Sequence, residues 1–202
     1  MENDFTNLLP DQEKIEKRYA FISDGVLRAN VVIAFRYIVF LINLESHNKL
    51  PGPILYSLYK DLIVQTATII ESCIHYTLQS NIDNGIINES AILGEEWIEE
   101  KNIILHAYDD GSKRVCGVVQ KKKVHELSNH THFLQLNRAC KKAGIFTELS
   151  FNAAEKLRTS RNKIHLAGLK EIDILYSKAE VDVHFNYANI VLNRLEIRLA
   201  ER

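Results

Sequence analysis

The longest continuous helical pattern in the chain, Ile54–Gln79, restricts the fold more than any other feature. Apolar residues recur there every three or four positions, which is the period of one face of an α-helix. They form two adjacent stripes, one of Leu55, Leu58, Leu62, Thr66, Ile69 and Cys73 and the other of Ile63, Ala67, Ile70, Ile74 and Leu78. An apolar surface this wide indicates burial on two sides, either in the core of a helical bundle or in a dimer interface.

Helical patterns cover most of the remaining sequence. They are predicted at Asp11–Ser23 with Asp11 as N-cap, Val26–Ser46, Asn129–Ala143 with Gly144 as terminator, Glu148–His165, and from Ser177 or Ala179 to the C-terminus. Only 3 prolines and 8 glycines occur in 202 residues, which argues against a turn-rich all-β fold. We therefore expect one all-α domain, 1–202, in which 1–50 is an N-terminal helical pair and 54–202 is the bundle core.

The most apolar run, Val31–Leu44, raises the question of a membrane. Arg36 interrupts this run, and it is shorter than the ~20 apolar residues that span a bilayer. The opening residues "MENDFTNLLP" lack the basic-then-apolar order of a signal peptide. Three widely spaced cysteines fit a reducing compartment. We expect a buried helix here, in a cytoplasmic protein that does not contact the membrane.

A small β-hairpin insertion at about 97–123 breaks the helical pattern. Two β-prone runs, Asn102–Tyr108 and Arg114–Gln120, flank Asp109-Asp110-Gly111, and Asp-Gly is the signal of a tight hairpin turn. A lone hairpin is marginally stable in water, so it should pack on the helical body or on a partner. The acidic cluster before it is expected to be the solvated edge of a helix or loop, and comprises Glu95, Glu96, Glu99 and Glu100.

Four polar residues near the end of a late helix form the candidate site. Arg158, Arg161, Asn162 and His165 are three or four residues apart, so a helix would place all four along one stripe. Arginine offers a planar fork of donors that matches a phosphate, and histidine titrates near neutrality and can move a proton. This set suits cleavage of a phosphodiester. The alternative is that basic residues simply complement the negative end of the helix dipole.

The stretch "LRTSRNKIHLAG" resembles the motif of the HEPN family, α-helical bundles found in prokaryotic toxins, phage-defence systems and CRISPR-associated ribonucleases. The family motif is an arginine, usually followed by a polar residue, and a histidine a few residues later near the end of a late helix. Arg161-Asn162 and His165 match these types, and the resemblance extends from Ile54 to the C-terminus with the hairpin as an insertion. Arg161 is one residue closer to His165 than is usual, whereas Arg158 has the usual spacing, so either arginine can fill the role.

The resemblance implies a metal-independent endoribonuclease without a cofactor. Two copies of the motif helix would face each other across a two-fold axis and form one composite site that leaves 2′,3′-cyclic phosphate ends. His165 would transfer protons, Arg158 and Arg161 would hold the phosphate, and Asn162 would position them. Lys121, Lys122 and Lys123 would hold the RNA backbone, or they are only a solvated end of the strand.

The same resemblance places the protein in a toxin–antitoxin or phage-defence system, with an antitoxin or a nucleotidyltransferase as candidate partner. Two other functions remain open: a non-catalytic HEPN-like module that binds RNA, a nucleotide or a protein, and a purely structural helical protein. The sequence has no P-loop, Rossmann, α/β-hydrolase or zinc-peptidase motif. His125, His130 and His132 lie close together but lack a zinc-ligand spacing, so we expect no metal site.

Overall fold

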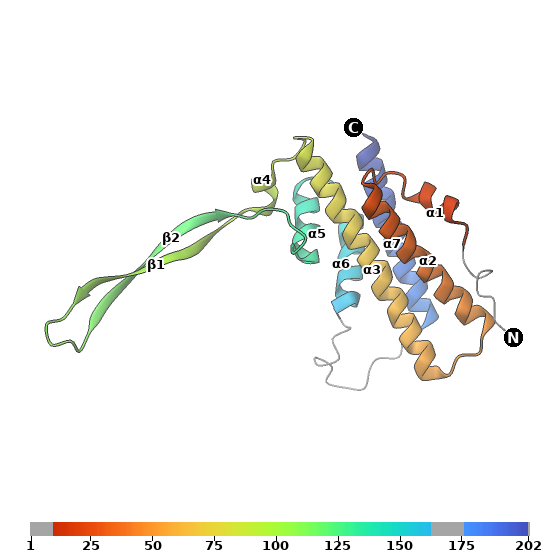
Figure 1. Cartoon of the computed structure of the whole chain (residues 1–202), viewed down its shortest axis with the longest axis horizontal. Helices are drawn as coiled ribbons and strands as arrows, with labels where there is room; N and C mark the ends of the chain where they lie inside the picture. The colour runs from red at the N-terminus through yellow and green to blue at the C-terminus, as the bar shows by residue number, and fades with distance from the viewer. Residues whose placement is uncertain (1–9, 163–175, 202) are drawn as a thin grey trace.

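A computed structural model describes residues 10–162 and 176–201 of the chain, and this part is mostly helical with one two-stranded antiparallel sheet (Figure 1). The elements in chain order are α1 Gln12–Arg18, α2 Gly25–His47, α3 Gly52–Asp83, α4 Glu89–Leu93, β1 Glu95–Ala107, β2 Arg114–Val124, α5 Phe133–Lys142, α6 Glu148–Asn162 and α7 Lys178–Ala200. The predicted helical fold with a hairpin insertion is confirmed at this level.

Helix α3 is the central element of the bundle. It packs against α2, α5, α6 and α7, with α2 on one side and α5 and α6 on the other (Figure 1). Both predicted stripes are buried except for Leu55, which is half-buried. The wide apolar surface of α3 is therefore used within one chain, as the core of the bundle.

Helix α2 is less buried than its composition predicts. Only Val31, Val32, Ile38 and Leu41 are buried, while Val26 and Ile33 expose 75% and 64% of their surface. The prediction of a buried helix was wrong for this outer face, because the run is apolar all round but its neighbours α1 and α3 cover only part of it. By length and composition α2 could cross a membrane: it has 23 residues, a mean hydropathy of 1.8, and 22% of that stretch buried in the structure.

A tight turn joins α5 to α6 and fixes the direction of α6. Gly144 has a φ of +69°, and the Ile145 and Gly144 amides donate to the carbonyls of Cys140 and Lys141 at 2.9 and 3.1 Å. This is the Schellman ending that glycine favours. The start of α5 differs from the prediction, because 129–132 is a loop and the helix begins at Phe133.

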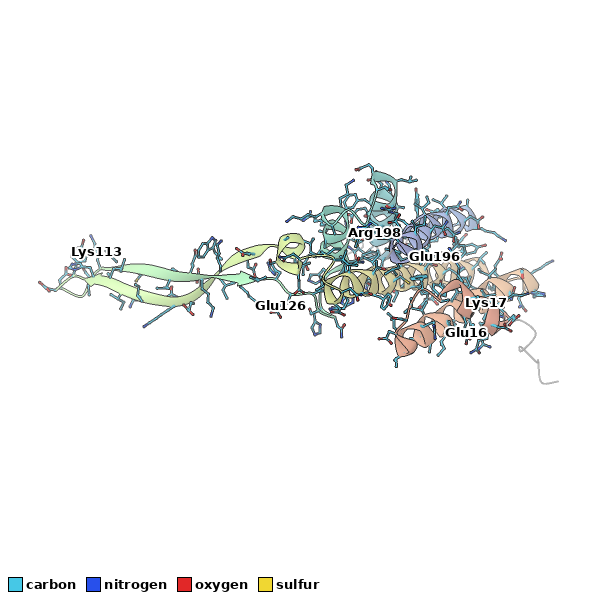
Figure 2. All side chains as sticks on the ribbon, turned by 90° about the horizontal axis from the view of Figure 1, so that it is seen from above. Glu16, Lys17, Lys113, Glu126, Glu196 and Arg198 are labelled. Carbon is cyan, nitrogen blue, oxygen red and sulfur yellow. The ribbon has the colours of Figure 1, made fainter. Side chains whose placement is uncertain are left out.

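The hairpin is longer than predicted and leaves the bundle (Figures 1 and 2). Its strands begin at Glu95 and end at Val124, so the acidic cluster lies on β1 rather than on a helix or loop edge. Residues 108–113 form the connecting loop, which includes the predicted turn at Asp109-Asp110-Gly111. Of the strand residues only Ile98, Ile103 and Gly117 are half-buried. The sequence predicted that the hairpin packs either on the helical body or on a partner. It does not pack on the helical body.

Candidate functional site

An open cleft of about 620 Å³ lies where the end of α6 meets α5, α3 and the loop 129–132. Its ionisable lining consists of Glu71, His130, His132, Arg138, Arg158 and Arg161, and Asn162 lies at its edge. Three arginines and one glutamate thus line the same cleft. Three of the four residues predicted for the motif line this single cleft, while the fourth, His165, lies outside the described residues.

Arg161 crosses from α6 to α3 and forms an ion pair with Glu71. The Nη1 atom of Arg161 lies 3.2 and 3.1 Å from Oε1 and Oε2 of Glu71. The pair joins residues 90 positions apart in sequence. Both contacts use the same nitrogen, so Nε and Nη2 of Arg161 donate to no residue that the structure describes. The Arg161 side chain is 36% exposed, which leaves these donors open to a ligand from the cleft.

Glu71 is held in this pair at an energetic cost. Burial raises the pKa of the Glu71 carboxyl, and the neighbouring Arg161, His132 and His75 lower it only in part. His75, four positions after Glu71 on α3, lies with its Nε2 atom 3.1 Å from the carbonyl of Ser128. A carboxylate whose pKa is raised by burial in a cleft is a common feature of functional sites.

Arg158 is bound within its own helix. Its Nε and Nη2 atoms both donate to Oε2 of Glu155, at 3.0 and 2.9 Å, and Asn137 of α5 donates to the other carboxylate oxygen at 2.6 Å. This bidentate contact occupies the donor edge that a phosphate would use. Arg161 therefore has more free donors toward the cleft than Arg158.

The cleft continues toward the base of the hairpin. A second open cleft next to it shares His130, Thr131, His132 and Gln135 and adds Lys123 and His125. A third, on the other side of Arg161, is lined by Glu71, His75 and Tyr76 among others. Because neighbouring clefts share lining residues, we refer to the three together as the polar groove.

The three lysines proposed to bind RNA divide into two groups. Lys121 and Lys122 form ion pairs with Glu100 and Glu95 across the hairpin, at 3.1 and 2.9 Å, whereas Lys123 lines the groove. Glutamates on β1 offset the first two charges, which leaves Lys123 as the lysine best placed for an anionic ligand.

One polar pair near the cleft was missed by the sequence interpretation. Nε2 of His184 on α7 lies 2.6 Å from Oγ of Ser160, and its Nδ1 lies 2.6 Å from the carbonyl of Glu180. The contact with the carbonyl places a proton on Nδ1 and leaves Nε2 to accept from the serine hydroxyl. The sequence carried no signal for this pair, because its partners lie on different helices.

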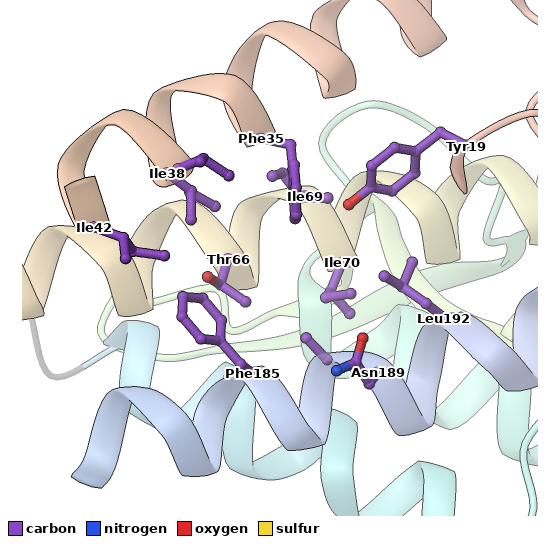
Figure 3. Close-up of a pocket in the computed structure, with 12 residues that line it drawn as sticks. Tyr19, Phe35, Ile38, Ile42, Thr66, Ile69, Ile70, Phe185, Asn189 and Leu192 are labelled. Atoms are coloured by element: carbon purple, nitrogen blue, oxygen red, sulfur yellow. The ribbon is translucent and has the colours of Figure 1, made fainter. Parts of the chain in front are cut away.

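A separate apolar cavity of about 260 Å³ lies between α2, α3 and α7 (Figure 3). Phe35, Ile38, Ile69, Phe185 and Leu192 form most of its wall. Thr66 donates its hydroxyl proton to the Leu62 carbonyl at 2.7 Å, so this polar atom is already bonded. The cavity has the chemistry of core packing and is remote from the charged groups of the groove.

Within the described part of the chain, no three His, Cys, Asp or Glu residues are arranged to hold a metal ion. Comparison with known proteins gives no further guidance, since no family model, curated protein or solved structure matches the chain.

Proposed function

We propose that the chain is a metal-independent endoribonuclease of the HEPN type, acting as a homodimer. The observation that carries this proposal is the cleft at the end of α6, which Arg138, Arg158 and Arg161 line together with Glu71. Guanidinium groups bind the phosphate and stabilise the charge that develops on its oxygens during transfer. The resemblance of the motif supplies the reaction class.

Arg161 is the proposed phosphate clamp, with Glu71 as its positioning residue. Glu71 holds Nη1 of Arg161, while Nε and Nη2 bond to none of the residues 10–162 and 176–201. Arg138 is exposed, lines the same cleft and adds a second cation. His165 is the proposed proton-transfer residue: its neutral imidazole takes the 2′-hydroxyl proton as the 2′-oxygen attacks the adjacent phosphorus, and the 5′-oxygen leaves with a proton taken from solvent.

The proposed biological role and location follow from the same resemblance. We propose a cytoplasmic toxin or phage-defence effector, held inactive by an antitoxin or nucleotidyltransferase. In the dimer the two motif helices would share one composite site. Lys123 is the proposed contact to the RNA backbone beyond that site.

The test is cleavage of end-labelled RNA in EDTA, with product ends identified by mass spectrometry. Arg161→Ala and His165→Ala should each lower the rate on the order of 10²-fold or more, the typical effect of removing one transition-state donor. Lys156→Ala is the matched control, because Lys156 is an exposed cation of α6 that does not line the cleft. Since Arg161→Ala leaves Glu71 unpaired, Glu71→Gln/Arg161→Gln separates loss of fold from loss of chemistry. Wild-type protein that yields no cyclic phosphate, or His165→Ala with full activity, refutes the assignment.

A second function is favoured by the ion pairs themselves. Arg158 and Arg161 each form an ion pair with a carboxylate. Such pairs are expected where arginines stabilise a binding surface rather than act on a substrate. A non-catalytic module that binds RNA, a nucleotide or a protein through this groove would retain RNA on a filter without cleaving it. Arg138→Ala and Lys123→Ala would then weaken retention, and the difference from wild type would become smaller at higher salt.

A further inference from the structure

The outer half of the hairpin has apolar side chains without a covering surface. Their exposed fractions are 60% for Ile104, 63% for Leu105, 49% for Tyr108, 46% for Val115, 47% for Val118 and 39% for Val119. Neighbouring residues of a strand point to opposite faces, so Val118 and Val119 make both faces apolar. A free two-stranded ribbon is marginally stable, and contiguous exposed apolar surface of this kind marks an interaction site.

The inner half of the hairpin differs, because its polar groups are paired within the ribbon. Glu95 and Glu100 bind Lys122 and Lys121, and the ammonium of Lys122 lies 5.7 Å from the centre of the Trp97 ring. These contacts link the two strands at the base to each other. The apolar outer half is presented to solvent as an arm.

A second uncovered apolar surface lies on the opposite side of α3. It consists of Val26, Ile33 and Tyr37 on α2 with Ile54 at the start of α3, exposed by 75%, 64%, 42% and 56%. The Tyr37 hydroxyl donates to Asp61 at 2.9 Å, so its ring is fixed on the surface. Helix α3 separates this face from α5 and from the base of the hairpin, so the hairpin of the same chain points away from it (Figure 1).

We infer that the outer half of the hairpin is an arm that packs on the exposed face of α2 in a second copy of the chain. A two-fold axis satisfies both surfaces at once, because each arm meets the other copy's face and the assembly closes at two copies. The arm is long enough: the 13 residues of β1 span about 43 Å at ~3.3 Å per residue. The axes of packed helices lie ~10 Å apart. The path from the α5 of one copy, across the bundle of the partner, to the partner's α2 is therefore about 30 Å.

The area available fits a stable dimer. Side chains of this size expose on the order of 300 Å² on one face of the arm and on the order of 500 Å² on the face of α2. Two equivalent contacts would bury about 1,600 Å², the size of a standard protein interface. This dimer turns the α5 and α6 sides of the two copies toward each other. The inference does not depend on ribonuclease activity, only on the presence of two copies.

The first test measures mass by light scattering after gel filtration of the full chain. Wild type is expected to be a dimer, and Ile104→Glu, which faces Cys116 across the ribbon on the arm, and Ile33→Glu on α2 should each raise the dimer dissociation constant at least tenfold. Ser112→Glu, in the exposed connecting loop, is the matched control and should remain dimeric. Circular dichroism of each variant checks that the bundle is folded.

The second test identifies the surfaces in contact. Wild type, whose exposed cysteine is Cys116 on the arm, is mixed with Cys116→Ser/Ile33→Cys and mildly oxidised; Cys73 and Cys140 are buried. A disulfide-linked pair of the two different chains is expected, and none with Cys116→Ser/Asn186→Cys, which places the thiol on an exposed position of α7. Any of three results overturns the inference. The wild type is a monomer, both glutamate variants leave the dimer unchanged, or the wild type binds lipid vesicles through α2 as a monomer. Absence of RNA cleavage leaves this inference unaffected, so its failure and that of the proposed function are distinguishable.

Discussion

Replacing Leu157 by alanine tests whether the buried face of α6 holds the arginines in place. Leu157 is fully buried and lies one residue before Arg158, on the side of α6 that packs into the core. Removing its branched end deletes buried carbon atoms and leaves a cavity, which costs about 3 kcal/mol within the usual range of 2–5 kcal/mol. For a chain of this size each kcal/mol lowers the melting temperature by about 2–4 °C. The expected decrease is therefore about 6–12 °C.

Urea denaturation followed by circular dichroism measures this cost directly. The slope with denaturant should be unchanged, because the surface exposed on unfolding hardly differs. Lys156→Ala, one position earlier and exposed, should change the free energy of unfolding by less than about 0.5 kcal/mol. A loss below about 1 kcal/mol for Leu157→Ala would mean that this face of α6 is not in the core, and the orientation of the arginines would then be wrong.

Three further substitutions probe polar and backbone features. Burial raises the pKa of Glu71, so its contribution to folding is full below the unfolded value of about 4.3 and is lost as pH rises through the folded pKa. Wild type should therefore lose stability relative to Glu71→Gln as pH rises from about 4 to 7 in urea titrations, and a constant difference would contradict this. Ser160→Ala removes the 2.6 Å contact with His184 and should cost about 0.5–1.5 kcal/mol by thermal denaturation; an unchanged melting temperature would show that the contact contributes nothing. Gly144→Ala places a side chain at a φ of +69° and should cost about 1–2 kcal/mol, while Gly25→Ala, at the start of α2, should cost nothing; equal effects would argue against backbone strain.

Features set by neighbouring residues were predictable from the sequence. Asp11 accepts from the Glu13 amide at the start of α1, Ser177 caps α7, and Gly144 ends α5, all as their local chemistry indicates. The two stripes of α3 were also predictable, because a helix repeats its faces at a known period. Such local and periodic signals give the order of the helices and the central place of α3.

Contacts between distant elements were not predictable in the same way. Glu71 had a nearer candidate in His75, and only the packing of α6 on α3 brings Arg161 to it instead. The extent of the hairpin was underestimated, because the glutamates at its base are poor strand formers that are held by the facing lysines. The exposure of α2 depends on how many neighbours cover it, which its own composition does not encode.

Because the hairpin is separate from the bundle, its amide hydrogens should exchange with solvent by a different route from those of the helices. The amides of α3 are shielded by helices on two sides, so their hydrogen exchange should require global unfolding. The hairpin amides are held only by the ladder between β1 and β2, so they can exchange through a local opening that leaves the helices intact. One protein thus contains two exchange regimes. If a second copy covers the arm, both would slow as protein concentration increases, because the dimer must dissociate before the hairpin opens or the chain unfolds.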